Sequence, residues 1–75
     1  MTITDYEIYV EKPGPNGNSF IGTASDVHMA TDTARRMAPK LGLPIIVSGI
    51  CDSGSRREVR FNPTGRTDRL WQNNK

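Results

Sequence analysis

Apolar and polar residues alternate over DYEIYVEK near the start of the chain. Tyr6, Ile8 and Val10 form one face of this segment, whereas Tyr9 lies with acidic residues on the other. A two-residue period with β-branched and aromatic side chains is typical of a strand that has one buried face. The pattern therefore predicts a strand near residues 4–12.

A loop and a second short strand follow. PGPNGN at 13–18 contains two prolines and two glycines, which interrupt regular structure. SFIGTA then predicts a strand near residues 18–24. We expect the two strands to form an antiparallel hairpin with a longish connection.

The period then changes to that of a helix, predicted near residues 26–40. Ser25 and Asp26 both suit an N-cap, where a side-chain oxygen accepts from free amides of the first turn. Pro39 lacks an amide proton and is expected to end or tighten the helix just before it. Gly42 suits the residue after the C-cap. The predicted buried stripe is narrow and consists mostly of small residues: Val27, Ala30, Ala34, Met37, Ala38 and Leu41.

Two further strands are predicted after the helix. PIIVSGIC is apolar on both faces, so residues 44–51 are expected to form a central strand that is covered on both sides. After a turn at DSG, RREVRFN alternates again and predicts a strand near 56–62. Arg57, Val59 and Phe61 share one face of that strand.

The order β-β-α-β-β predicts an α+β fold, with a four-stranded antiparallel sheet and one helix packed on one face. Residues 1–62 would form this single domain, and residues 63–75 an irregular basic C-terminal tail. The sheet face away from the helix would stay uncovered and carry Tyr9 together with arginines of the last strand. Aromatic side chains and arginines are enriched at protein interfaces.

Charge is distributed unevenly along the chain. Residues 1–34 carry five acidic residues and one lysine, whereas residues 35–75 carry nine basic and three acidic residues. A chain of 75 residues has room for only a thin core, so a bound partner or a second copy would add stability. The lone Cys51 cannot form an internal disulfide, and no signal peptide or membrane span is recognisable, which favours the cytoplasm.

The basic residues concentrate in RREVRFNPTGRTDRLW at 56–71. We expect one basic patch that binds an acidic protein surface, with Trp71 as a neighbouring anchor. Single-stranded nucleic acid is an alternative ligand, because it binds to basic residues interleaved with aromatic rings. A third interpretation is an ordinary strand face with cross-strand pairs to Glu7 and Glu11. The candidate partner-binding residues are Tyr9, Arg56, Arg57, Arg60, Arg66, Arg69 and Trp71.

The sequence offers little for catalysis. Its single His28 and single Cys51 are too few for a metal site, which needs three or four ligands. No serine lies in a G-x-S-x-G turn. We therefore predict no enzymatic activity, no catalytic or metal-ligating residues and no cofactor.

One succession of elements runs through the segments YEIYVE, FIGTAS, ATDTARRMAPKLGLP, IIVSG and VRFNP. This succession resembles small phage-encoded anti-CRISPR proteins that inhibit type I CRISPR–Cas complexes. The resemblance extends over residues 6–63 and excludes the arginine-rich tail and the 13–18 loop. It implies a non-enzymatic inhibitor in the cytoplasm of a bacterial host, which binds a Cas subunit and blocks recruitment of target DNA or of the nuclease. It transfers no contact residue.

Two classes of function therefore compete. The first is a protein-binding inhibitor, and the second is a small accessory protein that binds nucleic acid through its basic C-terminal region. A homodimer that pairs through the open sheet face is a third interpretation. No contact with a membrane is predicted.

Overall fold

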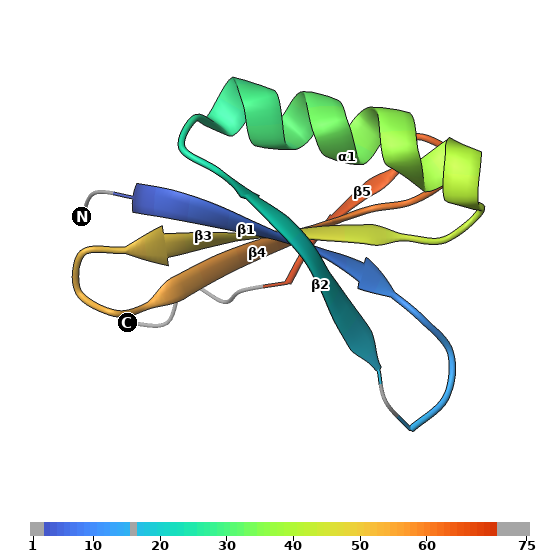
Figure 1. Cartoon of the computed structure of the whole chain (residues 1–75), viewed down its shortest axis with the longest axis horizontal. Helices are drawn as coiled ribbons and strands as arrows, with labels where there is room; N and C mark the ends of the chain where they lie inside the picture. The colour runs from blue at the N-terminus through green and yellow to red at the C-terminus, as the bar shows by residue number, and fades with distance from the viewer. Residues whose placement is uncertain (1–2, 16, 71–75) are drawn as a thin grey trace.

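The computed structural model describes residues 3–15 and 17–70. Its elements are β1 (Ile3–Glu11), β2 (Asn18–Ala24), α1 (Val27–Leu41), β3 (Ile45–Cys51), β4 (Arg56–Phe61) and β5 (Thr67–Arg69). The strands form one antiparallel sheet in the order β2-β1-β3-β4-β5, and α1 lies on one face of it (Figure 1). The α+β class with one helix on one face is confirmed. The predicted number of strands is wrong, because the described chain contains five.

The additional strand, β5, lies within the segment that was expected to be irregular. A tight turn brings it back along β4: the Gly65 amide donates to the Asn62 carbonyl at 3.0 Å, and Pro63 occupies the second position of this turn. Proline at that position and glycine at the fourth position are typical of a type I turn. The Asn62 amide then donates to the Arg66 carbonyl at 2.8 Å, which starts the β4–β5 pairing.

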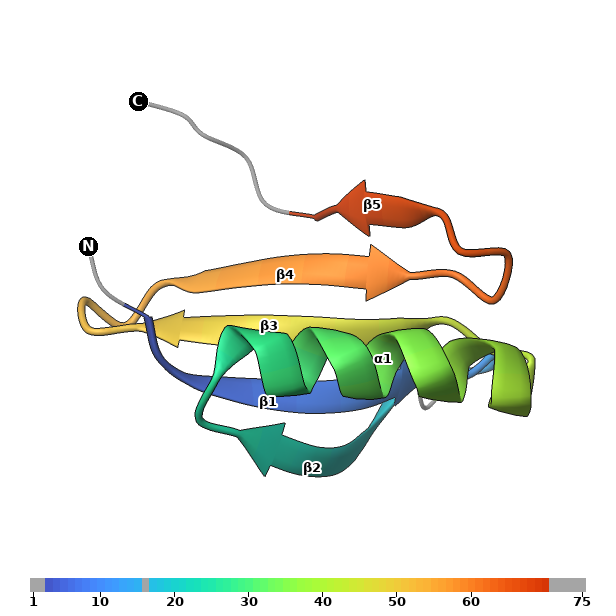
Figure 2. The ribbon, with the colours of Figure 1, turned by 90° about the horizontal axis from the view of Figure 1, so that it is seen from above.

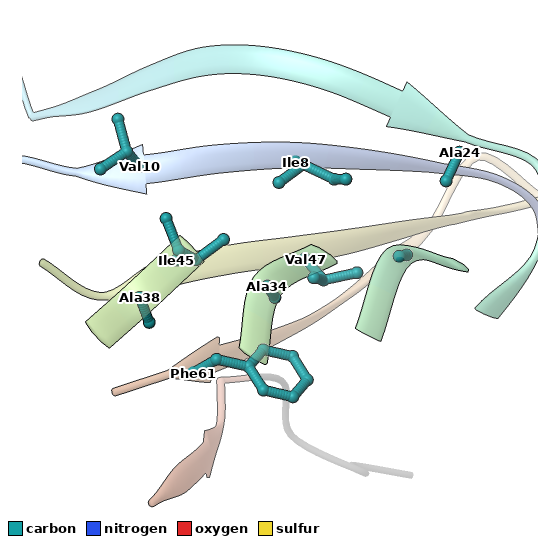
Figure 3. Packing of buried hydrophobic residues seen from close by; sticks show 9 residues of the cluster. Ile8, Val10, Ala24, Ala34, Ala38, Ile45, Val47 and Phe61 are labelled. Carbon is teal, nitrogen blue, oxygen red and sulfur yellow. The ribbon is translucent and has the colours of Figure 1, made fainter. Parts of the chain in front are cut away.

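The core lies mainly between α1 and strands β1 and β3. Ala30, Ala34 and Ala38 have no exposed surface and belong to one buried cluster with Ile45 and Val47 of β3. Figure 3 shows Ala34 and Ala38 beside these two side chains. Because alanine side chains are short, the helix can approach the sheet closely. β3 is the predicted central strand and is buried at every residue except Ile50, which is intermediate.

The helix ends show one confirmed and one corrected prediction. Asp26 is the N-cap, and its carboxylate accepts from the His28 amide at 3.0 Å. The helix does not end before Pro39 but continues to Leu41. Pro39 lies in the last turn, where its missing amide removes only one helical hydrogen bond. Gly42 adopts φ 68°, and its amide closes the helix on the Ala38 carbonyl at 2.8 Å.

One helix is too narrow to cover the whole sheet. Five strands span about 19 Å at ~4.8 Å between neighbours, whereas a helix with its side chains is about 10 Å wide. Figure 2 shows α1 over β1 and β3, with β4 and β5 beyond its edge. The predicted stripe is also buried only at its centre, since Val27 is 45% exposed and Leu41 46% exposed.

No helix in the described residues is long and apolar enough to cross a membrane.

Candidate binding surfaces

The strand register determines which side chains share a face of the sheet. One row that faces α1 runs Ile8, Val47, Val59 and Arg69. The adjacent row on the other face, which we call the open face, runs Phe20, Tyr9, Ile46, Arg60 and Asp68. No element in the described residues covers the open face (Figure 1). The predicted position of Tyr9 on an uncovered face is confirmed.

Arg56 connects β4 to β1 and β3 on the open face. Its Nη1 donates to Glu7 Oε1 at 2.8 Å and to Ser48 Oγ at 3.1 Å. The Tyr9 hydroxyl donates to the same Glu7 oxygen at 2.7 Å. The hydrogen bond from Arg56, followed by that from Tyr9, lowers the pKa of the Glu7 carboxyl, and the bond to Glu7 raises the pKa of the Tyr9 phenol. Ser48 is fully buried, and this guanidinium satisfies its hydroxyl.

Arg60 makes a second cross-strand cluster beside the first. Its Nε and Nη2 donate to the two carboxylate oxygens of Glu11 at 2.6 and 3.4 Å. Its Nη1 lies 3.7 Å from Asp68 on β5, and the Asn62 amide group also donates to Asp68 at 3.0 Å. The hydrogen bonds to Glu11 raise the pKa of Arg60 further above its ordinary value. The structure therefore contains the cross-strand ion pairs to Glu7 and Glu11 that the third interpretation of the basic segment expected.

An aromatic pair lies at the β1–β2 side of the open face. The rings of Tyr9 and Phe20 meet edge to face, with centroids 5.5 Å apart. Phe20 is 55% exposed. Ile46 lies between Tyr9 and Arg60 in the register, and these larger neighbours leave it only 4% exposed. The open face thus combines an exposed aromatic ring with charged side chains that hydrogen bonds hold in place.

The two faces differ in charge. The open face carries five carboxylates, on Asp5, Glu7, Glu11, Glu58 and Asp68, and two guanidinium groups, on Arg56 and Arg60. The strands thus leave an excess of three negative charges on this face, and Arg66 in the β4–β5 turn, 3.5 Å from Asp68, offsets one of them. The charged residues in the strand rows that face α1 are Arg57 and Arg69. The open face is therefore acidic and the helix side of β4 and β5 is basic.

The predicted basic patch is not one surface. Arg56 and Arg60 lie on the open face among carboxylates, while Arg57 and Arg69 lie on the helix side. Arg66 lies in the β4–β5 turn, 3.5 Å from Asp68. Trp71 lies outside the described residues. Arg56 and Arg60 instead have carboxylate partners on β1, a strand from the acidic N-terminal half of the chain.

A groove lies on the helix side, where α1 leaves the sheet uncovered; we call it the helix-side groove. Its larger hollow has a volume of about 240 Å³ and is lined by residues that include Tyr6, Val47, Gly49, Arg57, Val59 and Phe61. A smaller hollow of about 170 Å³ continues past Phe61 to Arg35, Pro39 and Gly65. The guanidinium of Arg35 lies over the Phe61 ring, 5.9 Å from its centroid.

The two isolated candidates for chemistry, His28 and Cys51, differ in burial. His28 is exposed at the start of α1, and Cys51 is buried at the end of β3. Among the described residues, no group of three or more His, Cys, Asp or Glu side chains could hold a metal ion.

Comparisons with known proteins give no relative on which to base a function. No family model, curated protein or solved structure matches the chain.

Proposed function

We propose that this protein is a non-enzymatic binding module that recognises another protein through its open face. The observation that carries the proposal is the joint presence of an exposed aromatic ring and an acidic charge excess on one uncovered sheet face. Phe20 can enter a pocket of a partner, as large apolar anchors do at interfaces. The carboxylates of Glu7 and Glu11 are already held by arginines, so binding would order few additional side chains.

The charge of the open face changes the expected partner. An excess of carboxylates is complementary to a basic surface rather than to the acidic one that the basic C-terminal sequence suggests. Basic surfaces are what proteins present to DNA phosphates. Within the narrower proposal, that the chain is an anti-CRISPR protein acting on a Cas subunit, an acidic face favours obstruction of target-DNA recruitment over obstruction of nuclease recruitment.

The direct test is target-DNA binding by purified type I complexes. The protein is expected to reduce DNA binding, and the variant Asp5→Asn with Glu58→Gln is expected to inhibit less, because it removes two charges and leaves both arginine clusters intact. Asp52→Asn, in the β3–β4 turn, is the matched control and should inhibit like the wild type. Unimpaired DNA binding in the presence of the wild type would contradict the narrower proposal.

A nucleic-acid-binding accessory protein is the second candidate. The basic helix side favours it, since Arg57 and Arg69 lie there with Arg35, Arg36 and Lys40 of α1. Binding through phosphate contacts would weaken steeply as salt concentration rises. Gel-shift titrations of DNA and RNA at two salt concentrations separate the candidates, because protein binding through the open face requires no affinity for nucleic acid.

A further inference from the structure

We propose that the helix-side groove binds a short protein segment in which an apolar side chain is flanked by carboxylates. This site goes beyond the function proposed above, because it lies on the opposite side of the sheet from the open face. Its floor is formed by Val47, Val59 and Phe61, and α1 forms one wall.

The depth of the groove follows from the residues around it. Gly49 has no side chain, and a Cβ there would lie 3.1–3.3 Å from side-chain atoms of Ile3 and Tyr6, so glycine leaves room for these two side chains to line the groove. The alanine stripe seats α1 over β1 and β3, and Val59 beyond its edge is left only partly buried. The hollows of about 240 and 170 Å³ are smaller than the ~300–1,000 Å³ of most small-molecule sites. They suit one or two side chains of a peptide.

The charged lining residues determine which peptide fits. Arg57 lines the larger hollow and Arg35 the smaller one, and no Asp or Glu in residues 3–15 or 17–70 lines either hollow. Guanidinium groups pair with carboxylates in a planar, two-pronged geometry. A segment with an apolar residue between acidic ones would place its side chain on Val59 and its carboxylates beside Arg35 and Arg57.

Nucleic acid fits the same groove less well. Base stacking needs an exposed aromatic face, whereas Phe61 is only 7% exposed and lies beneath the Arg35 guanidinium. The ring is therefore part of the floor and not a stacking platform.

The test is an NMR titration of the ¹⁵N-labelled full chain with two blocked hexapeptides. The acidic probe is acetyl-Asp-Glu-Leu-Leu-Asp-Glu-amide, and its matched control carries lysine at the four charged positions. The acidic probe should shift the amide signals of Thr31, Val59 and Gly65 and leave that of Phe20 unchanged. Affinity for the lysine peptide should be at least about fivefold weaker, because its positive charges repel the arginines that line the groove.

A pair of neighbouring arginines supplies the variant test. Arg35→Glu should weaken binding of the acidic peptide at least about fivefold, since it reverses a lining charge. Arg36→Glu is the control: Arg36 points outward and pairs with Asp32 at 3.2 Å, so it should change the affinity less than about twofold.

Four results would overturn the proposal: no shifts with the acidic peptide, equal binding of both peptides, shifts on the open face instead, or stronger shifts of the groove signals with decathymidine. Signals in the groove that move with protein concentration alone would also overturn it, because the occupant would then be a second copy. Apart from shifts on the open face itself, these outcomes do not bear on partner binding by that face, which depends on different residues.

Discussion

The guanidinium of Arg56 on β4 reaches across β3 and lies 2.8 Å from the carboxylate of Glu7 on β1. These residues come from the basic C-terminal half and the acidic N-terminal half of the chain. The strand order β1-β3-β4 brings the halves together, so their opposite charges are paired on one surface. The remaining charge is distributed unevenly between the two sides of the sheet, with excess carboxylates on the open face.

The first prediction concerns the pH dependence of stability. The folded-state pKa of Glu7 lies below its ordinary value, first because of Arg56 and then because of Tyr9. This ion pair therefore stabilises the fold fully above about pH 4.3, the ordinary pKa of glutamate, and the stabilisation is lost as pH falls through the lowered value. NMR titration of the side-chain carboxyl carbons should show the Glu7 pKa rise strongly in Arg56→Gln and less in Tyr9→Phe. Equal pKa values in the wild type and Arg56→Gln would contradict the geometry.

The second prediction compares two arginines near Asp68. Arg60→Gln should lower the free energy of unfolding by about 1 kcal/mol, the upper end for partly exposed ion pairs, because it removes the guanidinium that pairs with both Glu11 and Asp68. Arg66 has an 81% exposed side chain, so Arg66→Gln should cost less than about 0.5 kcal/mol. Urea denaturation measures both values. Equal urea midpoints for the two variants would contradict the ion-pairing role of Arg60 on the open face.

The third prediction tests the close seating of α1. Ala34 has no exposed surface, so Ala34→Leu forces the helix away from β3 and should destabilise the domain by about 1–3 kcal/mol. Lys40→Leu, on the exposed side of the same helix, should stay within about 0.5 kcal/mol of the wild type. Thermal and urea unfolding give the comparison. An Ala34→Leu variant as stable as the wild type would mean that the helix does not pack closely on the sheet.

The local patterns predicted the elements well because each has a physical period. The two-residue alternation placed Ile8 and Tyr9 on opposite faces, and the helical spacing identified the buried alanines. Asp26 and Gly42 marked the helix ends through their capping chemistry. Pro39 was misleading because its effect depends on how many helical bonds lie beyond it, and few do so close to the C-terminus.

The features that the sequence did not predict depend on contacts between residues that are distant along the chain. The pairing of Arg56 with Glu7 and of Arg60 with Glu11 needs the order and register of β1, β3 and β4, which no local period contains. β5 had one local signal, the turn Asn62-Pro63-Thr64-Gly65, but its three residues show no alternation. The helix-side groove follows from the width of one helix against five strands, so it could be recognised only once the strands were counted.

The most direct test of the open face as a protein-binding surface is quantitative co-purification with three baits. Wild type, Phe20→Ser and Met29→Ser are used with lysates of bacteria that do or do not contain type I complexes. Phe20 and Met29 are similarly exposed, at 55% and 57%, but Met29 lies on α1 and serves as the control. A specific partner should be retained by the wild type and by Met29→Ser and be lost with Phe20→Ser. Retention of the same partner by Phe20→Ser, or retention of no partner by the wild type, would contradict the central claim.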